Sequence, residues 1–116
     1  MTPYIFACIA VLAIASGQIL FKTVALKLVG RPLSEALTDT SVLIPFFLAA
    51  TIYAGATVFW ILALRDLSLS RGYMFMAASF VIVPVISSLL FDERLSLGFL
   101  AGVALIITGM IVTQTT

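Results

Sequence analysis

Residues 42–50 of the sequence are all apolar and read Val42-Leu43-Ile44-Pro45-Phe46-Phe47-Leu48-Ala49-Ala50. A helix that is apolar on every side is buried in a large protein core or surrounded by lipid. A strand of a membrane barrel would instead alternate apolar and polar residues. The same all-apolar character returns between Val81 and Leu90, apart from two serines. These runs predict helices that span a membrane.

The run at residues 42–50 lies within a longer stretch that carries no charged side chain. The sequence has four such stretches, of 20 to 25 residues, and its six Lys or Arg and five Asp or Glu all fall between them. About 20 apolar residues, at about 1.5 Å each, cross the hydrocarbon core of a bilayer. We therefore predict a single transmembrane domain of four helices, at about residues 3–29, 41–64, 71–91 and 96–114.

The composition excludes several classes of function. Of the 116 residues, 63% are apolar and 9% are charged, whereas roughly a quarter of an average soluble domain is charged. The net charge of +1 gives no reason to expect a nucleic-acid partner. With no histidine and only Cys8, the usual zinc site or Cys–His nucleophile cannot form. We expect no metal, no cofactor and no enzyme activity.

The connections between the stretches are short, so consecutive helices should run antiparallel in a compact all-α bundle. Ser41, Ser70 and Ser96 precede the last three helices, where a hydroxyl can accept from free N–H groups. Residues 33–37 are expected to form one short turn of helix at the membrane surface. Four Lys or Arg flank one side of the membrane and two the other, which weakly favours the first side as cytoplasmic.

The fourth helix carries a row of small residues. Gly98 and Gly102 form a G-x-x-x-G motif, and Gly109 extends the row along the same side. Small residues let two helices approach closely in lipid. Two interpretations stay open: the row joins two chains in a dimer, or it packs the helix within its own chain. Asp92 and Glu93, just before this helix, are expected to interact with the dipole at its N-terminus.

The segment from Gly102 to Ile111, with Leu105 and Ile106 at its centre, resembles the G-x-x-L-I-x-x-G signature of the dimer helix in small multidrug resistance proteins. The start of the chain is similar to the first helix of that family, and residues 91–96 resemble a connection common in drug/metabolite transporters. The likeness covers the whole chain. It implies a dimer whose interface includes Gly98, Gly102, Leu105, Ile106 and Gly109.

One position departs from the multidrug exporters. The proton-coupled members carry a glutamate in the middle of the first helix, and the matching residue here is Ile14. An isoleucine binds neither a proton nor a cationic drug, and an unpaired cation in mid-membrane is costly. Proton/cation antiport by the usual route is therefore not expected.

The closer resemblance is to the small subunits of the undecaprenyl-phosphate-aminoarabinose flippase. Residues 15–22, Ala15-Ser16-Gly17-Gln18-Ile19-Leu20-Phe21-Lys22, are similar to their A-G-Q-x-x-x-K stretch, and Gly72-Tyr73 followed by Phe80-Val81 is similar to their A-Y…F-V pattern. The resemblance implies movement of a lipid-linked sugar across the bacterial inner membrane by a pair of such chains, either identical or paralogous.

The residues themselves indicate a site on the first helix. Ala10, Ile14, Gln18 and Lys22 are spaced by four and share one face. This face passes from apolar to an amide and then an ammonium, the profile of a polyprenyl phosphate that carries a sugar. Lys22 would pair with the phosphate and Gln18 would bond sugar or phosphate oxygens. Alternatively, Lys22 extends to lipid headgroups and Gln18 bonds a neighbouring helix.

Further substrate-binding candidates are Tyr53 and Trp60 on the second helix and Tyr73 and Ser79 on the third. Tyr53 lies deep in its span, so its hydroxyl needs a partner. Trp60 is also explained as an interfacial anchor or a packing residue. Pro84 is expected to kink the third helix by freeing the carbonyl of Phe80, either as part of a moving element or as a static bend.

Three functions follow from these observations. The first is a flippase or exporter subunit for an anionic lipid-linked or amphipathic substrate, with membrane lipids around it. The second is an exporter of small metabolites or cationic drugs, coupled differently from the usual one. The third is a membrane subunit that scaffolds or regulates an enzyme without transport.

Overall fold

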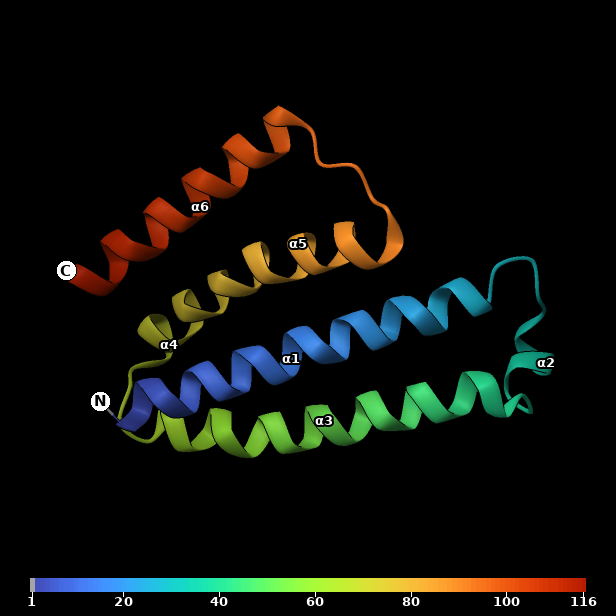
Figure 1. The fold of residues 1–116 in the computed structure, drawn as a ribbon. Helices are drawn as coiled ribbons and strands as arrows, with labels where there is room; N and C mark the ends of the chain where they lie inside the picture. Colours follow the sequence, from blue (N-terminus) through green and yellow to red (C-terminus); the bar gives the residue numbers. More distant parts are fainter. Residues whose placement is uncertain (1) are drawn as a thin grey trace.

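The computed structural model describes residues 2–116, and that part of the chain contains helices and no strand (Figure 1). Four helical segments are long and apolar enough to span a membrane, as the sequence predicts. The third span is a continuous series of α4, the 3₁₀ turn η1 and α5. The elements are α1 (Thr2–Lys27), α2 (Leu33–Ala36), α3 (Thr40–Leu64), α4 (Leu69–Phe75), η1 (Met76–Ala78), α5 (Ser79–Phe91) and α6 (Leu97–Thr115).

The spans lie side by side in the order α3, α1, α4–α5, α6 (Figure 1). The described chain measures 50 × 36 × 18 Å, so the helices form an open row one to two helices thick rather than a closed bundle. Helix–helix association in lipid has no hydrophobic driving force to close the row. The α6 helix forms one edge and has no buried residue.

The topology defines two faces of the membrane domain. Consecutive spans are antiparallel, so α1 and α5 run in the same direction (Figure 1). The N-terminal end of α1, the α3–α4 turn and the end of α6 lie on one face, here called the Arg71 face. The connections from α1 to α3 and from α5 to α6 lie on the other, here called the Lys22 face.

The tightest contact in the row is the seam between α1 and α3. The buried residues of α3 recur every seven positions, and three of the buried residues of α1 have the same spacing. Ala10, Ala49 and Ala63 have no exposed surface. A repeat of seven keeps one stripe facing a partner helix, and small side chains allow close van der Waals contact in lipid. The two series are Val42, Ala49, Ala56 and Ala63, and Ala10, Gly17 and Val24.

The short α2 helix closes the α1–α3 connection, where the sequence predicts a surface turn. Ala36 of α2 is buried against Val24 and Val42. Asp39 caps α3, in place of the expected Ser41: its side chain accepts a 2.9 Å bond from the amide of Ser41 and a 2.7 Å bond from its hydroxyl. Arg31 lies 2.9 Å from the same carboxylate. One side chain therefore fixes both the helix start and the connection.

Acid should weaken the contacts that Asp39 makes with Ser41 and Arg31 at the α1–α3 connection. The hydroxyl and amide of Ser41, and then Arg31, lower the pKa of Asp39 below its ordinary value of 3.8. Because the folded-state pKa is the lower one, the stabilisation is complete above the ordinary value and is lost as the pH falls through the lowered value. We expect hydrogen–deuterium exchange at Ser41 to accelerate, beyond the intrinsic pH effect, between about pH 5 and about pH 2. The Asp39→Asn variant keeps an acceptor and should lack this acid response; the same response in both proteins would contradict the assignment.

The third span differs in detail from the prediction. Ser68, and not Ser70, caps α4 by accepting from the amide of Arg71 at 3.3 Å. The helical geometry changes at Met76–Ala78, before Pro84, and α5 continues through Pro84 to Phe91. The kink expected at Pro84 stays a prediction.

The α6 helix is attached to the row near its C-terminal end. Arg71 Nη1 donates to the backbone oxygen of Gln114 at 3.0 Å, and Gln114 Nε2 donates to the backbone oxygen of Arg71 at 2.9 Å. At its other end, Ser96 caps the helix as expected, accepting from the amide of Phe99 at 3.0 Å. These hydrogen bonds attach the C-terminal end of α6 to α4 on the Arg71 face. A groove remains between α6 and α5.

Candidate functional site

Gln18 and Tyr53 meet across the α1–α3 seam. Gln18 Nε2 donates to the Tyr53 hydroxyl at 2.5 Å, and the ring of Phe21 lies 5.3 Å from the ring of Tyr53. The tyrosine ring covers Gly17 so closely that a Cβ built there would lie 2.3 Å from Cε2 of Tyr53. Gln18 and Tyr53, which the sequence indicates as separate candidates, are thus in contact with each other. Gly17 makes the space for this contact.

Lys22 lies one turn beyond Gln18 on α1, toward the Lys22 face. Its Nζ is 3.6 Å from Oε1 of Glu93, and the two side chains are 44% and 42% exposed. The other oxygen of Glu93 accepts from the hydroxyl of Ser87, which is buried on α5. Glu93 therefore reaches back to α1 and α5, whereas the sequence analysis expected it to interact with the dipole of the last helix.

We call Gln18, Lys22 and Tyr53 the α1–α3 cluster. It passes from a hydroxyl and an amide inside the span to an ammonium near its end. The Gln18 side chain makes no second hydrogen bond within residues 2–116 and is exposed on the surface of the chain. Its carbonyl oxygen is free to accept from a ligand, and the Lys22 ammonium is held only by a partly exposed pair, which is weak.

Trp60 does not join this cluster. It lies seven residues from Tyr53 on α3, about 10 Å along the axis. A Cβ built on Gly72 would lie 3.5 Å from Cη2 of Trp60 and 3.1 Å from Cδ2 of Leu64. Trp60 therefore packs over Gly72 at the turn between α3 and α4, which agrees with the packing interpretation and not with a shared site.

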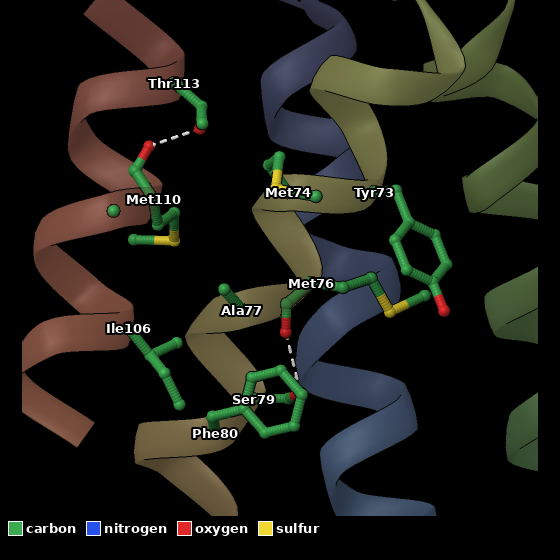
Figure 2. Close-up of a pocket in the computed structure, with 10 residues that line it drawn as sticks. Tyr73, Met74, Met76, Ala77, Ser79, Phe80, Ile106, Met110 and Thr113 are labelled. Atoms are coloured by element: carbon green, nitrogen blue, oxygen red, sulfur yellow. Dashed lines mark hydrogen bonds between the residues drawn. The ribbon is translucent and has the colours of Figure 1, made fainter. Parts of the chain in front are cut away.

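A second candidate region is the groove between α4–α5 and α6. Its largest cavity, of about 420 Å³, has walls rich in methionine and includes the predicted residues Tyr73 and Ser79. Figure 2 shows Met110 and Ile106 extending from α6 toward the facing helix, while the Tyr73 ring is directed away from α6. Ser79 donates to the backbone oxygen of Met76 at 2.7 Å (Figure 2). Its hydroxyl is thus bonded within its own helix.

A further cavity of about 310 Å³ continues the groove beside Pro84. Gly98 and Gly102 line this cavity, Gly109 lines the larger one, and Ile106 lines both. A Cβ on Gly102 or Gly109 would meet nothing within 4 Å. The row of small residues therefore faces open space within residues 2–116. Leu105 has 75% of its surface exposed and lines neither cavity.

Apart from Trp60, the predicted substrate-binding residues thus fall into two regions. Gln18, Lys22 and Tyr53 come together on α1 and α3, and Tyr73 and Ser79 line the groove. The pair of Lys22 with Glu93, which also accepts from Ser87, could not be predicted from the sequence because Lys22 and Glu93 are distant in the chain. The seven-residue spacing of the residues that are buried on α3 can be seen in the sequence, but it was not among the predictions.

Comparisons with known proteins place the chain in a family. A relative from Pseudomonas fluorescens (strain Pf0-1) is 32% identical over 116 residues, which cover 96% of this chain and 86% of the relative. One from Enterobacter sp. (strain 638) is 30% identical over 118 residues, covering 96% and 93%. Both are named "Probable 4-amino-4-deoxy-L-arabinose-phosphoundecaprenol flippase subunit ArnF".

A shorter match, to the subunit of the same name from Pseudomonas savastanoi pv. phaseolicola, is 40% identical over 63 residues. It covers 53% of this chain and 46% of that relative, and further matches to subunits of the same name span 55–63% of the length of those relatives. No family model matches the sequence, and no solved structure matches it significantly.

The names of the two relatives matched over most of their length agree with the resemblance found in the sequence, and the described chain has four helices able to span a membrane. The chain is a multi-pass membrane protein that belongs to the family of the 4-amino-4-deoxy-L-arabinose-phosphoundecaprenol flippase subunits ArnF.

Proposed function

We propose that this chain is a flippase subunit that moves an anionic lipid-linked sugar, a polyprenyl phosphate, between the leaflets of the bacterial inner membrane. The relatives are named for a lipid-linked sugar of this kind, an aminoarabinose attached to phosphoundecaprenol, whose phosphate is anionic and whose sugar amine is cationic. Their name also supports assembly with a further subunit. The proposal extends the substrate class, the membrane and the partner from these relatives to this chain.

The observation that carries the proposal is that the α1–α3 cluster places an ammonium one helical turn from an amide and a hydroxyl. The Gln18 amide and Tyr53 hydroxyl are bonded to each other within the span, and the Lys22 ammonium lies about 6 Å further along the helix. In a lipid-linked sugar the phosphate joins the tail to the sugar, so the phosphate and the sugar hydroxyl groups are neighbours, and an ammonium one turn from an amide and a hydroxyl can bind both. Charge-assisted hydrogen bonds from an ammonium to phosphate are among the stronger polar contacts.

Glu93 pairs with Lys22 when no substrate is present, so a bound phosphate would compete with Glu93 for Lys22. The pair is long, at 3.6 Å, and more than two fifths of each side chain is exposed, so its contribution to stability is small. A phosphate carries at least as much negative charge as a carboxylate. We expect the phosphate to replace Glu93 at Lys22, while Ser87 keeps its bond to the displaced carboxylate.

The open edge of the row supports a paired assembly. The α6 helix has no buried residue, and Leu105 on its surface belongs to the resemblance with a dimer helix. A second chain, identical or paralogous, would cover this edge and complete a path across the membrane. We place the interface on the outer side of α6, at Leu105. The other residues that the resemblance assigns to it, Gly98, Gly102, Ile106 and Gly109, line the groove toward α4–α5.

Transport should depend on the charge of Lys22. In proteoliposomes that contain the chain and its partner subunit, we expect Lys22→Gln to slow the transbilayer movement of labelled phosphoundecaprenol about 10- to 100-fold. This range follows from about 1.5–3 kcal/mol for a hydrogen bond to a charged group. Lys22→Arg keeps the charge and should retain most of the rate.

The matched control is Lys27→Gln. Lys27 is on the same helix and donates to the backbone oxygen of Ser41 at 2.7 Å, away from the α1–α3 cluster. Its loss should leave transport within about twofold, since an exposed contact is worth little. Equal rates for Lys22→Gln and the wild type would contradict the proposal, and so would export of a cationic dye in place of the phospholipid.

A further inference from the structure

The groove beside α6 has a polar end on the Arg71 face. There a cavity of about 260 Å³ is lined by Arg71, Ser68, Ser70 and Thr116, together with Met74 and Thr113. Met74 and Thr113 also line the 420 Å³ cavity, and Phe80 and Ile106 connect that cavity to the one beside Pro84. The three cavities form one groove along α6, polar at one end and apolar through the rest.

The polar end carries an unmatched positive charge. Within residues 2–116, Arg71 has no carboxylate partner, and the nearby Asp66 pairs with Arg65 at 3.4 Å. One nitrogen of the Arg71 guanidinium donates to Gln114. A guanidinium has five N–H donors, so the others remain available to an anion, and its planar fork suits a phosphate.

We propose that this groove binds a polyprenyl phosphate with its phosphate at Arg71 and its isoprenoid chain along the apolar part. The inference rests on the proposed function and deepens it. Lys22 lies on one face of the membrane and Arg71 on the other, so the chain would hold the phosphate at a separate place in each leaflet. Movement between leaflets would then pass the phosphate from one cation to the other.

The alternative occupant is the α6 helix of a second copy. A helix of the length of α6, about 28 Å long and 10–12 Å wide with its side chains, occupies roughly 2,200 Å³ or more, whereas the largest cavity of the groove holds about 420 Å³. The α6 helix also has no charged residue, so it would leave the Arg71 charge unmatched. A polyprenyl phosphate is thin enough for the groove, and its anionic end would match the charge of Arg71.

The experiment uses Trp60, the only tryptophan. Its ring lines none of the three cavities but packs over Gly72, the residue next to Arg71, so its fluorescence follows a displacement of the start of α4 when a ligand binds at Arg71. Undecaprenyl phosphate is titrated into the full chain in nanodiscs of uncharged lipid. We expect a saturable change in emission, with an affinity about tenfold lower or more for Arg71→Gln, the loss of one charge-assisted bond. Arg71→Lys should restore most of it.

Two further variants test the apolar part. Gly109→Leu fills the groove without meeting an atom within 4 Å of the new Cβ, and it should weaken binding at least about tenfold. Ala104→Leu adds the same side chain at an exposed position that lines none of the three cavities and should leave binding unchanged. Arg65→Gln, which removes a paired arginine near the same face, should also leave it unchanged.

Probes separate the phosphate from the chain. Undecaprenol, which lacks the phosphate, should bind weakly and without dependence on Arg71, and inorganic phosphate alone should not change the emission at equal concentration. Saturable binding that is indifferent to both Arg71→Gln and Gly109→Leu would overturn the inference, while transport that still needs Lys22 would leave the proposed function intact. A Gly109→Leu variant that only converts a dimer to a monomer would assign the groove to a second copy.

Discussion

Replacing Ala56 with leucine should strongly destabilise the fold. Ala56 lies in the α1–α3 seam with 2% of its surface exposed, between Ala49 and Ala63, which have none. The added carbon atoms have no space unless α1 and α3 move apart. Overpacking of a well-packed core costs about 1–3 kcal/mol and occasionally more, and here separation of the helices would also lose contacts along the seam. We expect the free energy of unfolding in mixed micelles to fall by about 3 kcal/mol.

Ala54→Leu is the matched control for this prediction. Ala54 is on the same helix and is exposed, so the identical change adds an apolar side chain where lipid can surround it. Its effect should stay within about 0.5 kcal/mol. Equal losses of stability at positions 54 and 56 would mean that the seam is not where α3 packs.

Replacing Gly17 with alanine should damage both the seam and the α1–α3 cluster. Alanine is normally favoured over glycine within a helix by about 1 kcal/mol. At Gly17, however, the new methyl group would lie 2.3 Å from one carbon of the Tyr53 ring and 2.6 Å from another. The ring must move, and its 2.5 Å bond to Gln18 must break. We expect a net loss of about 1–3 kcal/mol in unfolding experiments.

Gly55→Ala provides the contrast. A Cβ at Gly55 meets nothing within 4 Å, so this variant should gain up to about 1 kcal/mol from helix propensity. In the Tyr53→Ala background the clash is absent, so adding Gly17→Ala should cost no stability beyond that lost through Tyr53→Ala alone. A Gly17→Ala protein as stable as Gly55→Ala would contradict the close contact of Tyr53 with α1.

The number of spans and their ends could be predicted from the sequence because charge is excluded from lipid. Every Lys, Arg, Asp and Glu falls between the apolar stretches, so the stretches define the helices to within a few residues. The caps were harder to predict. Asp39 and Ser68 compete with neighbouring serines for the same role, and an offset of two residues decides which side chain reaches the free amide.

The arrangement of the spans depends on long-range packing and was not predicted. Short connections indicate antiparallel neighbours, but they do not distinguish a closed bundle from the row seen in Figure 1. The seven-residue spacing of Ala49, Ala56 and Ala63 does indicate one close helix contact. The partner of that stripe became clear only from the burial of Ala10 and Gly17.

The candidate site could be predicted only in part, because some of its contacts also depend on long-range packing. Gln18 and Lys22 share a face of one helix, which periodicity reveals, and an amide or a phenol inside a span needs a partner. That Gln18 and Tyr53 partner each other depends on the register of α1 and α3. The contact of Lys22 with Glu93 depends on α1 and α5 ending at the same face, and the groove at Arg71 depends on how α6 is attached.

The central claim is that this chain moves a lipid because that lipid carries a phosphate. The most direct measurement compares the transbilayer movement of labelled aminoarabinose-phosphoundecaprenol and labelled undecaprenol in proteoliposomes that contain the chain and its partner subunit. We predict movement of the phosphate-linked lipid well above the rate in protein-free vesicles, and no acceleration of the uncharged alcohol. Equal acceleration of both lipids, or of neither, would contradict the account.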